Sequence, residues 1–323
     1  MKLFSYSNSG EYGLGIVIGD ACYDLHRANP KLPNNMVDFL EGGTATMTMA
    51  METSSALQSG AATVTPLTHV NFAAPVPQPS SCRDGYAFRQ HVETSRRNRG
   101  LPMIPEFDQF PVFYFTNHHA IFGPGNIHCM PEHFNQLDFE LEIAIVLNKR
   151  GRNVKAADAD SYIAGYMIMN DFSARHLQMQ EMKLNLGPAK GKDFATAIGP
   201  FLVTPDELVN YKIAPRDGHI GDAYNLEMTC KVNGALVSLG NFADMHWTFA
   251  EIIERISYGV DLYPGDIIGS GTVGTGCFLE LNGTMKLENP RYESRWLQPG
   301  DVVEMEVTGL GRLVNTMELE IAL

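Results

Sequence analysis

The chain lacks the features of a secreted, zinc-binding or membrane-spanning protein. Its five cysteines are odd in number and include no Cys-x-x-Cys pair, which argues against a disulfide framework and a cysteine zinc site. They are Cys22, Cys82, Cys129, Cys230 and Cys277. No stretch approaches the roughly 18 uninterrupted apolar residues of a membrane span, and the N-terminal MKLFSYSNSGEYG has no apolar signal segment. We therefore expect reduced thiols, a cytoplasmic location and no membrane partner.

Positive charge is also scarce. The 323 residues contain 24 lysines and arginines against 37 aspartates and glutamates, so the formal net charge is -13. Because phosphate binding needs clustered positive charge, we expect no nucleic-acid partner. The hydrophobic fraction of 44% is ample for a packed core, in one large domain with an appendage or in two domains.

The first 75 residues predict a small α+β domain. LFSYS and LGIVIG are typical of paired strands, whereas MVDFLEG and METSSALQSG are typical of helices. The proline-rich segment VNFAAPVPQPSS that follows is typical of a connector. We therefore place a boundary near residue 75, between an N-terminal domain at 1–75 and a larger domain at 76–323.

The larger domain is rich in short apolar segments separated by glycine and proline turns. Ten of these segments predict strands: PVFYFTN, AIFGPGN, FELEIAIVL, YIAGYMIMN, AIGPFLV, LEMTCKVNG, ALVSLG, DIIGSGT, CFLELNG and DVVEMEVTGLG. Helices are expected at 88–97, 174–182 and 249–257. This spacing favours a β-barrel or β-roll over a parallel sheet, so the expected fold class is mixed α/β and mainly β.

Carboxylates gather in the middle of the chain. In FELEIAIVL, Glu140 and Glu142 alternate, so a strand would point both to the same face. Asp171 follows an apolar strand-like run at 163–169. Such hard oxygen donors favour Mg²⁺ or Ca²⁺ over zinc. The alternative is that the two glutamates lie on the wet face of an edge strand, and the pair alone does not decide between these interpretations.

Five segments together resemble the fumarylacetoacetate hydrolase family. In chain order they are DGYAFRQH, FELEIAIVL, NDFSARHLQ, LGPAKGKDFATAIGPFLVT and GSGTVGTGCFLELNG, and they span the chain from about residue 82 toward the C-terminus. The resemblance implies the family's β-roll catalytic domain behind a variable N-terminal domain. It also implies a metal-dependent enzyme for small diketo or 2-oxo acids, commonly a homodimer.

The resemblance also implies a ligand set. Asp84 joins Glu140, Glu142 and Asp171 around one divalent metal, Mg²⁺ or Ca²⁺ with Mn²⁺ as a further option. Lys192 and Thr196 are also counted among the metal-site residues, since Thr196 matches a position that contacts a metal in some members of the family. Four carboxylates in one place would repel one another strongly without a cation. Asp84 could instead, or also, serve as the N-cap of the helix that follows.

Catalytic residues are implied in the same way. His91 corresponds to the family's general base, since a neutral imidazole can take a proton from water, and Glu280 to the residue that orients it. Three residues match donors that stabilise negative charge on the substrate: Arg175, Gln178 and Lys192. Four more match substrate-contacting positions: Tyr86, Tyr114, Gly271 and Thr272.

One position departs from the family pattern. Met182 stands where the animal-type enzymes carry a substrate-binding tyrosine, and the lid-helix basic residue has only the nearby Arg96, Arg97 and Arg99 as counterparts. We expect a hydrolase that cleaves a carbon–carbon bond of a β-diketo acid, such as fumarylacetoacetate or an acylpyruvate, in aromatic-compound or tyrosine catabolism. The alternatives are a decarboxylase, isomerase or dehydratase of a 2-oxo acid, or a metal-binding scaffold without catalysis.

Overall fold

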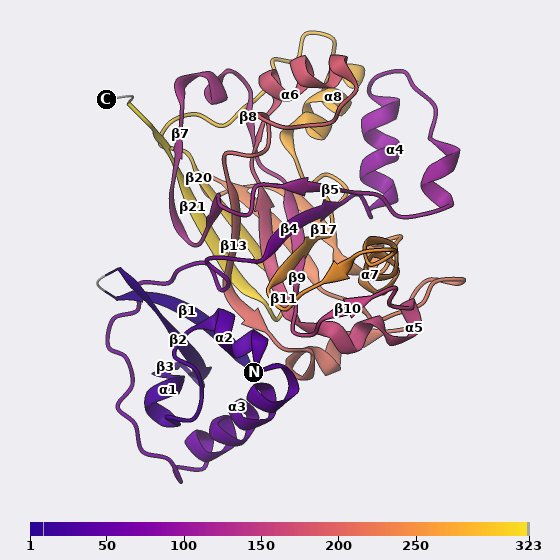
Figure 1. Cartoon of the computed structure of the whole chain (residues 1–323). Coiled ribbons are helices and arrows are strands. Elements are labelled where there is room, and N and C mark those ends of the chain that lie inside the picture. Colours follow the sequence, from indigo (N-terminus) through magenta and orange to yellow (C-terminus); the bar gives the residue numbers. More distant parts are fainter. Residues whose placement is uncertain (9, 322–323) are drawn as a thin grey trace.

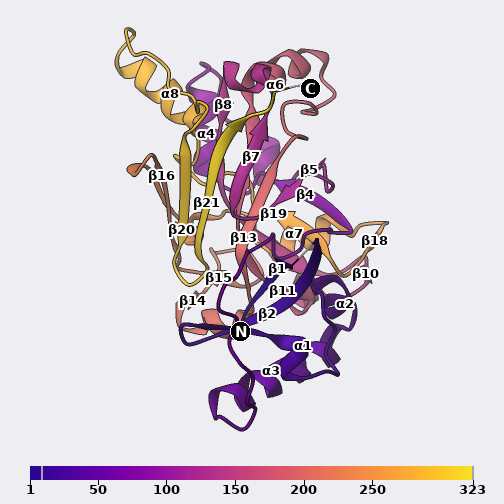
Figure 2. The same cartoon turned by 90° about the vertical axis from the view of Figure 1, so that its left-hand side faces the viewer.

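Two β-sheets pack against each other in the computed structural model, which describes residues 1–8 and 10–321. Figures 1 and 2 show the N-terminal strands and helices at the lower end of the molecule. Helices α4, α6 and α8 gather at the upper end (Figure 1). Among the described residues, no helix has the length and apolar character needed to cross a membrane.

The N-terminal region contains the expected paired strands and helices. Its elements are β1 (Lys2–Asn8), β2 (Glu11–Ile18), β3 (Ala21–Asp24), α1 (Leu25–Ala28), α2 (Met36–Glu41) and α3 (Gly43–Gln58). Strand β1 also pairs antiparallel with β13 (Thr196–Val203), so the N-terminal strands extend the larger sheet. The boundary near residue 75 stays a prediction.

The larger sheet runs in the order β3-β2-β1-β13-β11-β9-β19-β4-β5, and β6 pairs with β13. Its further strands are β4 (Ser81–Gly85), β5 (Phe113–Thr116), β6 (Ile121–Phe122), β9 (Leu141–Leu147), β11 (Ile163–Asp171) and β19 (Asp266–Gly269). The smaller sheet runs β17-β16-β20-β21-β7. It contains β7 (Gly125–Cys129), β16 (Glu227–Val232), β17 (Ala235–Asn241), β20 (Val302–Val307) and β21 (Gly311–Leu319).

Three short ribbons complete the strands of the described chain. They pair β8 (Leu137–Asp138) with β12 (Ser173–Ala174), β10 (Gly151–Arg152) with β18 (Asp261–Leu262), and β14 (Lys212–Ile213) with β15 (Ala223–Tyr224). The mixed, mainly β fold expected from the sequence is confirmed.

The three helices expected in the larger domain are confirmed to within one residue at each end. They are α4 (Arg89–Arg97), α6 (Arg175–Glu181) and α7 (Phe249–Ile256), and the structure adds α5 (Ala156–Ala159). In α7 the Thr248 hydroxyl and the Glu251 carboxylate form a capping box, which satisfies amide groups that a helix start leaves unpaired.

The expected strand at CFLELNG is wrong, because this segment begins helix α8 (Phe278–Glu288). Phe278, Glu280 and Asn282 are buried at alternate positions, and this pattern imitates the period of a strand. The backbone amides of Phe278 and Leu279 donate to the carboxylate of Asp138, which caps the helix from a distant segment. Local sequence does not reveal that partner.

Strand β9 lies in the interior of the larger sheet, between β11 and β19. Leu141, Ile143 and Ile145 pack into the core shared with the smaller sheet. Ala144 and Val146 face the second core, which includes residues of the N-terminal helices. Glu142 on this strand is fully buried, so the alternative of a wet edge strand is wrong.

Candidate active site

Four acidic side chains meet where neighbouring strands of the larger sheet end or begin. Asp84 lies on β4, Glu140 directly precedes β9, Glu142 lies on β9, and Asp171 ends β11. Strands β11 and β9 are neighbours, and β19 joins β9 to β4 in the sheet order, so the side chains converge. One carboxylate oxygen of each lies within 4.8 Å of those of the others, and all four residues are buried.

The cluster suits a divalent cation. Burial, together with the charge of Asp171, raises the pKa of Asp84 to about 7. Burial and the neighbouring Asp84, Glu140 and Asp171 charges also raise the pKa of Glu142 well above its ordinary value. Carboxyls in this position are stabilised as anions only when positive charge is supplied. The donor set is all oxygen, which fits Mg²⁺, Ca²⁺ or Mn²⁺.

Lys192 supplies one positive charge from the chain itself. Its Nζ lies 2.5 Å from Glu140 Oε2 and 2.7 Å from Asp171 Oδ2. Burial would lower the pKa of Lys192, but Asp171 and Glu140 outweigh burial and raise it, so the side chain stays an ammonium. Burial likewise opposes the ionisation of Glu140, yet Lys192 and Arg175 lower its pKa to about 2. Thr196 Oγ1 lies 3.5 Å from Asp171 Oδ1, beside the cluster as expected.

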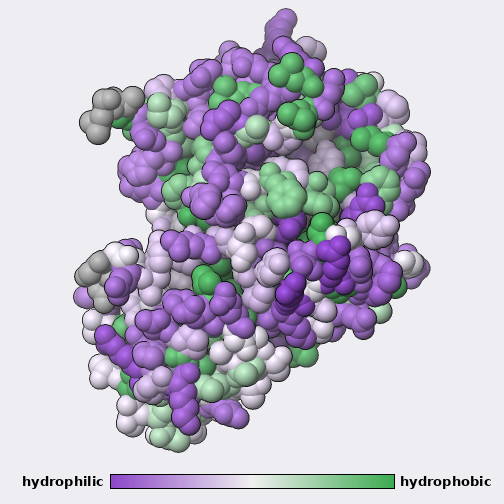
Figure 3. All heavy atoms as spheres, viewed as in Figure 1, coloured by the Kyte–Doolittle hydropathy of each residue, from purple (hydrophilic) through white to green (hydrophobic). Residues whose placement is uncertain are grey.

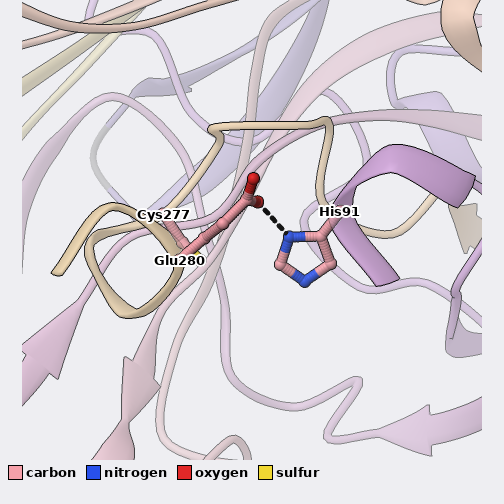
Figure 4. Close-up of side chains that lie close together, drawn as sticks. All are labelled: His91, Cys277 and Glu280. Atoms are coloured by element: carbon pink, nitrogen blue, oxygen red, sulfur yellow. Dashed lines mark hydrogen bonds and ion pairs between the residues drawn. The ribbon is translucent and has the colours of Figure 1, made fainter. Parts of the chain in front are cut away.

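His91 and Glu280 form a buried pair between helices α4 and α8. His91 Nδ1 lies 2.6 Å from Glu280 Oε2 (Figure 4). The other carboxylate oxygen accepts from the backbone amide of Thr275 at 3.0 Å. With the neutral imidazole donating from Nδ1, Nε2 is the ring nitrogen free to take a proton. Cys277, whose thiol the sequence analysis did not consider for the site, lies beside the pair.

Arg175, the first residue of α6, is held by three partners. Its Nε lies 2.8 Å from Asp138 Oδ2, its Nη2 lies 2.7 Å from Glu140 Oε1, and its Nη1 donates to Gln178 Oε1 at 3.0 Å. The bond to Oε1 orients the Gln178 amide so that its NH₂ group is available to another acceptor. Asp138 is the important residue that sequence reasoning missed. The signal was present, because Asp138 shares the alternation of Glu140 and Glu142.

Three of the expected substrate-contacting residues also form hydrogen bonds with the acidic cluster, and their contacts with a substrate stay predictions. Tyr114 donates to Asp171 Oδ2 at 2.5 Å, and Thr272 Oγ1 lies 3.4 Å from Glu142 Oε1. The amide of Gly271 lies 3.0 Å from Asp84 Oδ1 and 3.1 Å from Glu142 Oε2. Glycine is required there, since its φ is +78° and a Cβ would lie 2.6 Å from the Gly85 carbonyl oxygen.

Tyr86 lies edge-on to His91, with ring centroids 5.8 Å apart. The proposed capping role of Asp84 is wrong, because Asp84 belongs to β4 and the N-cap of α4 is Phe88.

One cavity of about 790 Å³ collects these groups. The expected site residues that line it are Asp84, Tyr86, His91, Tyr114, Glu140, Arg175, Gln178, Lys192, Gly271 and Thr272. Glu142, Asp171 and Glu280 lie directly behind this lining and bond to it. Met182 and Arg99 also line the cavity, whereas the neighbouring Arg96 bonds to the backbone oxygen of Pro102 instead. The structure therefore brings the expected residues together, and their catalytic roles stay predictions.

Comparison with known proteins agrees with the family resemblance of the sequence. The family model described as fumarylacetoacetate (FAA) hydrolase C-terminal matches residues 81–318. The chain is 33% identical to oxaloacetate tautomerase FAHD2B, mitochondrial, of Bos taurus, over 92% of this chain and 84% of that one.

Two solved structures share the fold. Fumarylacetoacetate hydrolase from Exiguobacterium antarcticum aligns with a TM-score of 0.73 and 24% identity, over 99% of this chain and 100% of that one. Maleylpyruvate hydrolase from Sphingobium sp. SYK-6 aligns with a TM-score of 0.68 and 22% identity, with the same coverage.

Proposed function

The chain belongs to the fumarylacetoacetate hydrolase family, and from this premise we propose that it hydrolyses a carbon–carbon bond of a β-diketo acid with the help of a divalent metal. The observation that carries the proposal is the buried His91–Glu280 pair, whose imidazole lines the same cavity as Asp84 and Glu140 of the acidic cluster. A base beside a cation site is the arrangement that water activation requires.

Asp84, Glu140, Glu142 and Asp171 would hold the cation. A divalent metal in this place supplies Lewis acidity toward the oxygens of a 1,3-dicarbonyl group. We propose Mg²⁺, Ca²⁺ or Mn²⁺, since the donors are hard oxygens.

His91 acts on water. Water gives a proton to His91 Nε2 while its oxygen bonds to the carbonyl carbon remote from the carboxylate, whose π electron pair moves to the carbonyl oxygen, and Glu280 stabilises the positive charge that the imidazole gains. The C=O double bond then forms again from that oxygen. The bond from that carbon to the neighbouring methylene carbon then breaks, and its electron pair becomes the enolate of a 2-oxo acid. The proton on His91 returns to the enolate carbon, so the products are a carboxylic acid and a 2-oxo acid.

Donors on α6 and the segment after it stabilise the enolate. Lys192 and Arg175 provide positive charge at the cavity floor, and Gln178 offers its NH₂ group. Their positions are fixed before substrate binds, because each is already held by a buried partner. Fixed charges cost no reorganisation during the reaction, which makes this kind of stabilisation effective.

A second candidate is keto–enol tautomerisation of a 2-oxo acid. The relative that is 33% identical over 92% of this chain is an oxaloacetate tautomerase, and this observation favours the alternative. Tautomerisation needs the same enolate but no attack by water, so His91 would only move a proton between carbon and oxygen.

One pair of assays distinguishes the two. Both assays contain Mg²⁺ or Mn²⁺. The first measures cleavage of acetylpyruvate, as the loss of its diketone absorbance and the release of acetate and pyruvate. The second measures tautomerisation of oxaloacetate, as the loss of its enol absorbance. Cleavage that falls by about 10²–10⁴-fold in His91→Ala supports the hydrolase. Interconversion of the keto and enol forms of oxaloacetate without any cleavage of acetylpyruvate would refute the hydrolase function and support the tautomerase function.

A further inference from the structure

Apolar side chains form part of the cavity above its charged floor. We call them the apolar wall: Val112, Met179, Met182, Pro188, Leu279 and Trp296. Val112, Met179 and Met182 are 44%, 38% and 45% exposed. Large apolar side chains left open to water inside a cavity are typical of a surface that a ligand covers.

The apolar wall begins next to the groups that would perform the chemistry. Leu279 directly precedes Glu280 on α8, and Met179 directly follows Gln178 on α6. Met182 lies one helical turn after Gln178, at the end of α6. Along α6, polarity therefore changes from charged and amide groups at the floor to apolar groups farther out, whereas α8 contributes Leu279 to the wall and the polar Asn282 and Lys286 farther along.

The volume of the cavity favours a substrate larger than a four-carbon acid. Cavities of about 300–1,000 Å³ bury drug-sized ligands, and this one measures about 790 Å³. A four-carbon acid bound at the floor would leave most of this space and the apolar wall to water. The remaining lining includes polar groups such as Asn98 and two exposed cations, Arg99 and Lys286, so an apolar acyl chain gains contact at the apolar wall rather than at these groups.

Figure 3 shows the cavity region from outside. A hollow opens in the upper half of this face, and apolar surface borders it. In Figure 1, helix α4 lies on one side of this place and helices α6 and α8 lie on the other. The opening leads from solvent past apolar atoms, which suits a substrate whose far end is not a small hydrated group.

We propose that the preferred substrate is a 2,4-dioxo acid with an extended apolar acyl chain, held with its dioxo end at the floor and its chain along the apolar wall. The proposal rests on the proposed hydrolase function, whose substrate class it narrows. Met182 fits this arrangement, because a thioether packs against an alkyl chain where a phenol would offer a hydrogen bond.

The test compares 2,4-dioxopentanoate with 2,4-dioxononanoate, which differ by a chain of methylenes and keep the same reacting groups. A fully buried methylene contributes about a fourfold gain in binding and a half-buried one about twofold. We expect kcat/KM for the nonanoate to be at least about tenfold higher, since the wall covers the chain on one side. An equal or lower value for the nonanoate would overturn the proposal. Failure to cleave either acid would instead refute the hydrolase function itself.

Variants of the apolar wall test where the acyl chain of the substrate lies. Met182→Asn should reduce the preference for the nonanoate to about threefold or less, because it replaces apolar contact by a group that prefers water. Met51→Asn on α3 is the matched control, since Met51 is 42% exposed and does not line the cavity, and its preference should equal that of the wild type. Val112→Asn provides a second test from another segment if Met182→Asn does not fold. If both wall variants kept the wild-type preference for the nonanoate, the acyl chain would lie elsewhere, and this result would overturn the proposal.

Discussion

Asp138 and Arg175 are joined by an ion pair of 2.8 Å in which both side chains are buried. The same carboxylate accepts from the amides of Phe278 and Leu279 at the start of α8. Arg175 in turn reaches Glu140 of the acidic cluster. Asp138 thus connects the helix that carries Glu280 with the arginine that faces the substrate, although it does not itself line the cavity.

We expect Asp138→Asn to reduce the free energy of unfolding by about 3 kcal/mol, because it leaves Arg175 buried with one charged partner fewer. The value of kcat should fall as well, since α8 positions Glu280. Urea unfolding and steady-state kinetics would measure both effects. Asp261→Asn is the matched control: it breaks a pair with the exposed Arg150 and should change the free energy of unfolding far less. Equal losses in both variants would contradict the positioning role.

His91→Ala should lower kcat by about 10²–10⁴-fold, the usual contribution of a positioned general base. Glu280→Gln should be similarly impaired, because the 2.6 Å bond to His91 orients the ring. Residues that act as a unit are not additive, so the double variant should resemble the worse single variant. A double variant far slower than either would refute the pairing. Equilibrium dialysis should show divalent-metal affinity close to that of the wild type in all three.

Divalent metal should raise the melting temperature of the wild-type protein, since a ligand at about 100 times its Kd stabilises by about 2.7 kcal/mol. Glu142→Gln should remove this increase. In chelator, however, the variant should melt higher than the wild type, because one of the mutually repelling buried carboxyls has been neutralised. Differential scanning calorimetry with and without metal tests both signs. A chelated variant that melts lower would show that repulsion is not the dominant cost of the cluster.

Asp160 provides a test of pH dependence outside the acidic cluster, since it precedes strand β11, whereas Asp171 is the last residue of that strand. Burial and the nearby Asp222 raise the pKa of Asp160 to about 6, above the value of about 3.9 in an unfolded chain. Between these values the unfolded chain loses its proton first, so this residue lowers stability as pH rises from about 4 to 6. Asp160→Asn should therefore gain about 1 kcal/mol at pH 8, after allowance for solvent screening of a partly exposed group, and nothing at pH 4. Unfolding curves at both pH values decide this, and a larger gain at pH 4 would contradict it.

The sequence determined the composition of the cavity floor and much of the fold. Alternation placed Glu140 and Glu142 on one side of a strand, and helical spacing located α4, α6 and α7, because these patterns depend only on backbone periods of about 2 and 3.6 residues. Resemblance supplied Asp84, His91 and Glu280, which no local pattern connects.

The tertiary structure decided what depends on partners distant in the chain. The strand expected at CFLELNG is helix α8, because Asp138, some 140 residues earlier, accepts its first amides. Glu142 is buried because β9 has a neighbouring strand on each edge and packed core on each face. The residue pattern of one strand does not predict these neighbours. Tyr114 on β5 bonds to Asp171 on β11, although β9, β19 and β4 separate these two strands in the sheet order. Burial and charge in this protein are properties of such long-range packing, and the local sequence carries only the side chains that take part in it.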